Sequence, residues 1–100
     1  MNAYQLISLR IYANSVVNSC CYALELGADN VEMVIRHKTF AQEIVDATLN
    51  FGDEASATAE LASLARENAD TLAEWLSMKG CRRTVSNAYC CAKAITAFAA

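Results

Sequence analysis

Hydrophobic residues recur every three or four positions along the chain, with polar residues between them, which is the period of a helix that buries one face. Over residues 3–26 the apolar stripe consists of Leu6, Leu9, Ala13, Val16, Cys20 and Ala23, widened by Ile7, Ile11, Val17, Cys21 and Leu24. Residues 30–51 carry a second stripe of Val31, Val34, His37, Ala41, Ile44, Thr48 and Phe51, with Ile35, Phe40 and Val45 beside it.

Two further stripes follow in the second half of the chain. Residues 54–79 contain Ala57, Leu61, Leu64, Ala65, Asn68, Leu72, Trp75 and Leu76, and residues 84–99 contain Val85, Ala88, Cys91, Ala92, Ile95 and Phe98. The glycines Gly27, Gly52 and Gly80 separate the four segments, and glycine is common just past a helix end. Asp29, in a pattern that resembles a capping box, and Asp53 are expected to cap the helices that follow them.

The sequence therefore predicts an all-α fold with four helices, near residues 3–26, 30–51, 54–79 and 84–99. The short connections make sequential helices antiparallel neighbours, so we expect an up-down-up-down four-helix bundle formed by one domain over residues 1–100. The absence of proline from all 100 residues agrees with a nearly all-helical chain.

Hydrophobic residues make up 55% of the chain, yet no apolar run is long enough to cross a membrane, and no signal-peptide pattern opens the sequence. The five cysteines are an odd number without the spacing of a secreted disulfide framework. These features predict a cytoplasmic protein with free thiols and no membrane partner.

Charge is unevenly distributed within a net charge of −3. Residues 43–74 carry eight acidic side chains and one cation, Arg66, which gives −7, while the rest of the chain carries seven basic and three acidic residues, which gives +4. The acidic excess argues against direct binding of nucleic acid.

Within this segment, Asp53, Glu60, Glu67 and Glu74 are spaced by seven residues, or nearly two helical turns, so they are expected to lie along one side of the third helix. Asp70 belongs to the same acidic row, and Glu43 and Asp46 are expected to flank it. A solvated helix face is the common alternative. The sharper hypothesis is a surface that binds a basic patch on another protein.

A compact basic corner, Lys79, Arg82 and Arg83, follows the acidic row and is a second candidate contact for a partner. Cations at such a position also complement a helix C-terminus without binding anything.

Two similar stretches, NSCCYA and NAYCCA, place Cys20, Cys21, Cys90 and Cys91 at the same expected end of the bundle as His37, the only histidine. A zinc site would use such ligands. Adjacent residues on a helix point about 100° apart, however, so neither pair can direct both sulfurs inward. Buried free cysteines and a solvated boundary histidine are the simpler interpretation.

These observations favour a small non-enzymatic protein that binds another protein, with no cofactor, no metal and no catalytic residue. The most specific version is an acidic inhibitor or adaptor that occupies a basic, nucleic-acid-handling surface of its partner. The alternatives are a thiol or metal protein that uses the layer of four cysteines and His37, and a structural homodimer subunit. Dimerisation would supply the burial that a short, alanine-rich chain lacks.

Overall fold

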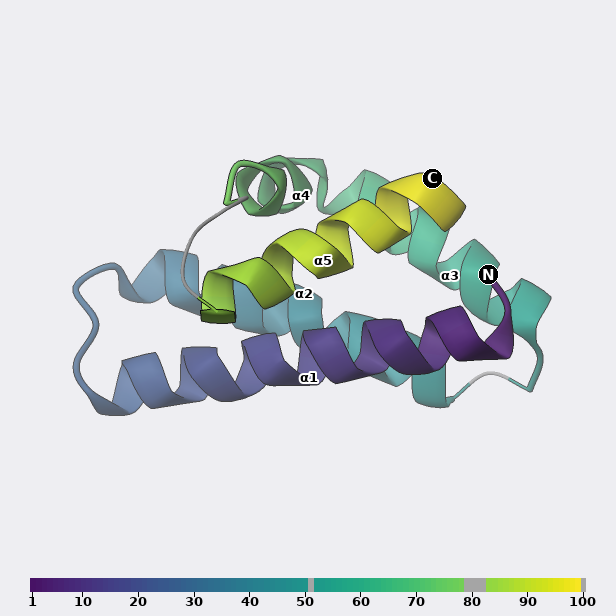
Figure 1. The fold of residues 1–100 in the computed structure, drawn as a ribbon. Coiled ribbons are helices and arrows are strands. Elements are labelled where there is room, and N and C mark those ends of the chain that lie inside the picture. Colours follow the sequence, from purple (N-terminus) through teal and green to yellow (C-terminus); the bar gives the residue numbers. More distant parts are fainter. Residues whose placement is uncertain (51, 79–82, 100) are drawn as a thin grey trace.

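The computed structural model describes residues 1–50, 52–78 and 83–99, although the side chains of residues 83–86 are not part of that description. This part of the chain contains five α-helices and no strand, which confirms the all-helical prediction. The helices are α1 (Ala3–Glu25), α2 (Val31–Leu49), α3 (Glu54–Glu67), α4 (Ala69–Leu76) and α5 (Arg83–Phe98), as Figure 1 shows. None of the helices in these ranges is long and apolar enough to span a bilayer.

The third predicted helix is interrupted at Asn68, so the expected count of four helices is wrong. Asn68 leaves helical geometry at φ −119° and ψ 36°, and its side-chain Nδ2 donates a hydrogen bond of 2.9 Å to the Leu64 carbonyl oxygen. The Asn68 backbone N–H donates to the same oxygen at 3.0 Å. An asparagine side chain competes in this way with the regular backbone bonds of a helix. The chain restarts as the short helix α4, which has its own direction (Figure 1).

The helix ends largely follow the sequence signals. Gly27 has φ +76°, its N–H donates to the Leu24 carbonyl, and the Ala28 N–H donates to the Ala23 carbonyl. This pair of bonds is the Schellman motif that a glycine past a helix end permits. Asp53 caps α3, as predicted, by accepting a hydrogen bond of 2.7 Å from the Ser56 backbone N–H.

The residue expected to cap the second helix is off by one position. Asn30, rather than Asp29, is the N-cap of α2, and its side-chain oxygen accepts a hydrogen bond of 3.3 Å from the Met33 N–H. Asparagine and aspartate are almost equally good N-caps, so the pattern Asp29-Asn30 does not by itself select one of them.

The core lies between all five helices. Figure 1 shows α1 and α2 side by side along the length of the molecule, with α5 above them and α4 beside α5. The largest fully buried side chains come from every helix and are Trp75, Phe40, Leu9, Ile44, Leu61, Ile95, Thr71 and Cys91. The molecule is thus held together by contacts between helices, most extensively between the consecutive helices α1 and α2 and between α1 and α5, which are distant in sequence.

Several residues at the edges of the predicted stripes do not enter this core. Ile7 and Ile11 of α1 are 50% and 60% exposed, and Ile35 of α2 is 48% exposed. Val31, Leu76 and Phe98 are exposed as well. Phe51 and the Val85 side chain lie outside the described residues. The narrow stripe of Leu6, Leu9, Ala13 and Val16 is buried as predicted, whereas its widening by Ile7 and Ile11 is wrong.

Candidate functional site

The acidic row does not form one continuous line of free carboxylates. Asp53 is engaged at the start of α3, where its carboxylate accepts hydrogen bonds from the Ser56 backbone and hydroxyl. These bonds lower the pKa of Asp53. Glu74 lies on α4 beyond the break at Asn68 and faces α2, where its carboxylate contacts the Arg36 guanidinium and the His37 ring. Glu60 and Glu67 remain on α3, about 10.5 Å apart along the helix axis.

Glu60 meets acidic residues of α2 across an open groove, and Glu67 lies about two turns further along α3, where its charge still acts on Glu43. The groove has a volume of about 340 Å³ and is lined by Glu43, Asp46, Ala47, Asn50, Glu60 and Leu64. We call the four carboxylates Glu43, Asp46, Glu60 and Glu67 the acidic groove. The sequence places Glu43 and Asp46 beside the row, but only the packing of α2 against α3 shows that they complete one site with Glu60 and Glu67.

The carboxylates of the acidic groove act on one another. Burial is the largest cause of a raised pKa at the Glu43 carboxyl. The negative charges of Glu67, Glu60 and Asp46, in that order, raise the pKa further. Within the described residues, the only ion pairs are those that Arg36 and His37 make with Glu74. No described cation therefore pairs with the groove, and a cationic group from outside would relieve this repulsion.

The opposite end of the row has a different electrostatic environment. Asp70 is exposed near the start of α4 and lines a small surface recess together with Glu67, Arg36 and Arg66. The two arginines offset the negative charge at this point, so Asp70 extends the acidic groove less than its sequence position suggests.

The basic corner predicted from the sequence lies outside the described part of the molecule. Lys79 and Arg82 are not among the described residues, and Arg83 begins α5 but its side chain is not described.

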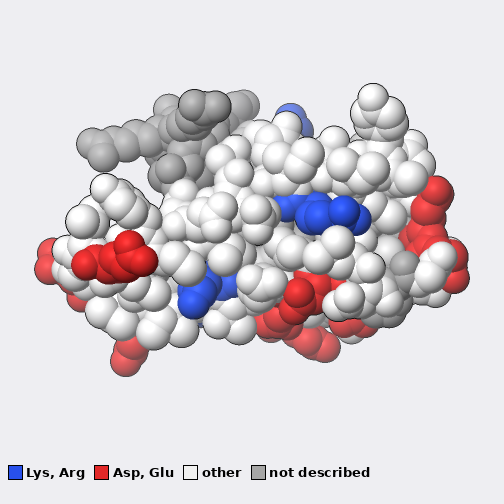
Figure 2. Space-filling view, turned by 90° about the horizontal axis from the view of Figure 1, so that it is seen from below, with Lys and Arg blue, Asp and Glu red and all other residues white. Residues whose placement is uncertain are grey.

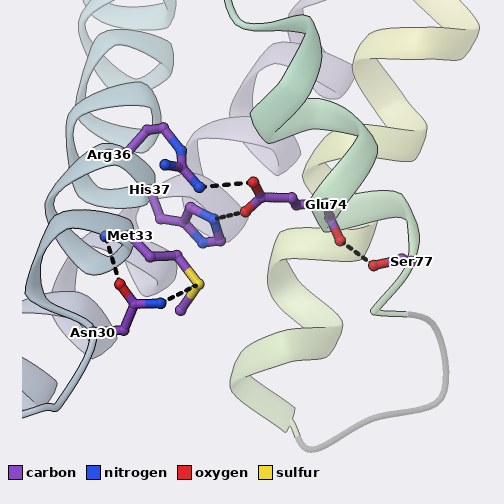
Figure 3. A network of polar contacts seen from close by, with 6 residues as sticks. All are labelled: Asn30, Met33, Arg36, His37, Glu74 and Ser77. Carbon is purple, nitrogen blue, oxygen red and sulfur yellow. Dashed lines mark hydrogen bonds and ion pairs between the residues drawn. The ribbon is translucent and has the colours of Figure 1, made fainter.

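Glu74 belongs to a polar network that joins α4 to α2 (Figure 3). Its two carboxylate oxygens contact Arg36 Nη2 and His37 Nε2, each at 2.7 Å. The hydrogen bond with His37, followed by the one with Arg36, lowers the pKa of Glu74. An ionised carboxylate only accepts hydrogen bonds, so His37 Nε2 carries the hydrogen in this pair.

His37 is buried, which corrects the expectation of a solvated boundary histidine. Its ring lies edge-on to Trp75 at a centroid distance of 5.9 Å, and Trp75 also packs on Phe40 at 4.9 Å. The position of His37 on the apolar stripe of the second helix was the available signal for burial, but the flanking Arg36 and Lys38 obscured it. Its partner Glu74 is distant in sequence and had no local signal.

The four cysteines of the two CC pairs do not form a metal cluster with His37. Cys91 is fully buried, while Cys20, Cys21 and Cys90 are half-buried free thiols. Burial raises the pKa of Cys20 and, much more strongly, that of Cys91. In the described ranges, no group of three or more histidine, cysteine, aspartate or glutamate side chains is arranged to hold a metal ion.

Comparisons with protein-family models, with curated proteins and with solved structures found no significant match to this chain. Functional inference therefore rests on the geometry of the chain itself.

Proposed function

We propose that this protein is a small, non-enzymatic, cytoplasmic binding module whose acidic groove receives a basic surface of another protein. The observation that carries the proposal is a set of three carboxylates that line one open groove, with Glu67 near enough to raise the pKa of Glu43, and none of the four pairs with a described cation. Lysine or arginine side chains of a partner would offset the mutual repulsion that raises the pKa of Glu43.

The groove also offers an apolar contact between its charges. Ala47 and Leu64 line it, and Leu64 is buried. A long cationic side chain can lay its methylene stem along such a surface while its charged end meets a carboxylate. Within the class of binding modules, we infer an inhibitor or adaptor that occupies a partner surface which otherwise handles nucleic acid, because such surfaces carry clustered lysine and arginine.

The structure changes which residues we assign to the contact. Glu60 and Glu67 keep the role proposed from the sequence, and Glu43 and Asp46 join them. Asp53 and Glu74 stabilise the fold through a helix cap and the α2–α4 network, so a charge reversal at either residue would test folding as well as binding. Asp70 stays at the margin of the proposed surface.

The test is affinity capture from the native host with the full chain as bait, followed by mass spectrometry. The diagnostic bait carries Glu60→Lys and Glu67→Lys in the acidic groove. The matched control carries Asp29→Lys and Glu32→Lys, which change net charge equally at exposed positions outside the groove. We expect the wild type and the control to capture a basic protein that the groove variant loses, in a salt-sensitive manner. Capture of the same proteins by all three baits would contradict the proposal.

A further inference from the structure

The outward side of α1 is an exposed, uncharged and partly apolar stripe. Its members are separated by three or four residues and share one face of the helix, and all are exposed: Tyr4, Ile7, Ile11, Asn14, Asn18 and Tyr22. We call this stripe the α1 outer face. It runs for about 27 Å along the axis, at 1.5 Å per residue. The opposite side of the helix, with Leu9 and Ala13 fully buried, packs into the core.

The spacing of the stripe is itself informative. Alternating steps of three and four residues are the pattern with which one helix packs along another. The core-facing stripe of α1 already has partners in α2 and α5. The outer face repeats the same pattern on the solvent side, where no described element of the chain covers Ile7 or Ile11. A solvated helix face normally carries charged residues instead.

Charge is almost absent from α1. Between Ala3 and Leu24 the sole charged residue is Arg10, and it is already engaged, because Nε and Nη2 donate to the Thr48 hydroxyl and carbonyl oxygens at 3.2 and 2.8 Å. Figure 2 views the molecule from below relative to Figure 1, where α1 is the low helix in front; on this face basic atoms form only isolated spots and acidic atoms gather toward the ends and one edge. Apart from the end where Ile7 lines a recess with Arg10, Asp53 and Glu54, a strongly acidic or basic partner would find little complementary charge on this face.

We propose that the α1 outer face is the contact between two copies of this chain. Each copy carries −3, so two copies gain by meeting where neither presents its acidic groove. The α1 outer face meets this condition, because the acidic groove lies on α2 and α3. The amides of Asn14 and Asn18 and the tyrosine hydroxyls both donate and accept hydrogen bonds, so the same groups on a second copy satisfy them.

The exposed area is of the size that a dimer needs. Tyr4 and Tyr22 are 84% and 63% exposed, which amounts to about 300 Å² for aromatic side chains of this size. With Ile7, Ile11 and the two asparagines, each copy contributes on the order of 500 Å², so a dimer would bury about 1,000 Å², the lower bound for a specific interface. Beside Tyr4, a recess of about 220 Å³ lined by Tyr12 and Phe98 can receive a side chain of the second copy.

Sedimentation velocity of the full chain, from micromolar to millimolar concentration, tests this contact. We expect a concentration-dependent dimer in the wild type. Ile11→Lys and Ile7→Lys, at the centre of the stripe, should each weaken it roughly tenfold or more, because they place a charge in the interface. Ile35→Lys is the matched control, since it introduces the same charge at a similarly exposed isoleucine on α2. Circular dichroism verifies that each variant remains folded.

The outcomes separate this contact from the acidic groove. A wild-type protein that remains monomeric at every concentration would overturn the proposal. It would point to a different protein as the partner of the α1 outer face. A dimer that Ile11→Lys and Ile7→Lys do not weaken, or that Ile35→Lys weakens equally, would overturn it as well. Glu60→Lys with Glu67→Lys should leave the dimer intact, so failure of the groove as a binding site has no bearing on this result.

Discussion

The two sides of the molecule are built from different amino acids. On the side formed by α2, α3 and α4, carboxylates line one groove, and burial together with these negative charges raises the pKa of Glu43. On the side formed by α1 and α5, two cations with described side chains are engaged: Arg10 bonds to Thr48, and Lys93 lies over the Tyr89 ring at 5.9 Å from its centroid. We propose a basic protein as the partner of the first side and a second copy of this chain as the partner of the second.

Side chains of the same type have different roles within each side of this molecule. Glu74 and Glu67 are both glutamates of the acidic row, yet Glu74 bonds to a buried histidine while Glu67 repels Glu43. Ile7 and Leu6 are adjacent apolar residues of α1, yet only Leu6 is buried. In both pairs the partner in space, rather than the residue type, decides whether a side chain stabilises the fold or remains available for binding.

The largest effect on stability is expected at Trp75, because this α4 side chain packs on Phe40 and His37 of α2 in the core. Trp75 is fully buried against Phe40 and His37, so Trp75→Ala removes a large aromatic side chain and leaves a cavity. We expect a loss of about 3–5 kcal/mol in the free energy of unfolding, measured by urea denaturation. Leu76→Ala, at the exposed neighbouring position, is the control and should cost far less. Equal losses would contradict the packing described for α4.

A smaller effect should divide the acidic row into structural and free members. Glu74→Ala removes the acceptor of the buried His37 ring and of Arg36, and we expect it to lower the free energy of unfolding by roughly 1–2 kcal/mol. Glu67→Ala removes a carboxylate that raises the pKa of Glu43 and accepts only a long hydrogen bond of 3.5 Å from the Ser63 hydroxyl among the described residues, so it should leave stability within about 0.5 kcal/mol of the wild type. If both variants lose the same stability in denaturant titrations, the division of the row is wrong.

The smallest effect concerns the acidic groove and pH. The pKa of Glu43 is raised in the folded state. The protonated Glu43 side chain therefore contributes fully to the free energy of unfolding below the ordinary glutamate pKa of about 4.3, and this contribution is lost as pH rises through the folded pKa. At pH 7 the ionised Glu43 therefore disfavours folding, and Glu43→Gln should stabilise the protein slightly, with no gain at low pH.

Glu74 should show the opposite dependence on pH. The pKa of Glu74 is lowered in the folded state. Its ionised carboxylate therefore contributes to the free energy of unfolding above the ordinary glutamate pKa, and this contribution is lost as pH falls through the lowered pKa. Thermal melts of Glu43→Gln and Glu74→Gln across pH 3–7 compare the two signs directly. A Glu43→Gln protein that is less stable than the wild type at pH 7 would show that the groove carboxylates do not repel one another.

Much of this arrangement could be predicted from local sequence. The 3–4 spacing identified the helices, and Gly27 and Asp53 take the terminal positions that their backbone and hydrogen-bonding chemistry favours. The seven-residue spacing placed Glu60 and Glu67 on one helix, α3, because both precede the break at Asn68. These features depend on residues within one or two turns of each other, where helix geometry alone determines the outcome.

The rest depends on contacts between distant segments. The bond between His37 and Glu74 joins residues 37 positions apart, and the acidic groove requires α2 and α3 to pack side by side. Asn68 fitted the apolar stripe of a continuous helix, and nothing nearby indicated that its side chain would take the Leu64 carbonyl. Ile7 and Ile11 are apolar whether they face the core or the solvent, so periodicity alone widened the stripe in the wrong direction.

The central claim is that the α1 outer face and the acidic groove are separate binding surfaces. Backbone amide NMR spectra of the isotopically labelled full chain test it most directly, first in a dilution series and then with a lysine- and arginine-rich peptide added at low salt. We predict that dilution shifts the amide signals of α1 between Tyr4 and Tyr22, whereas the peptide shifts those around Glu43, Glu60 and Glu67. Perturbation of the same residues by both treatments, or peptide-induced shifts centred on α1, would contradict the claim.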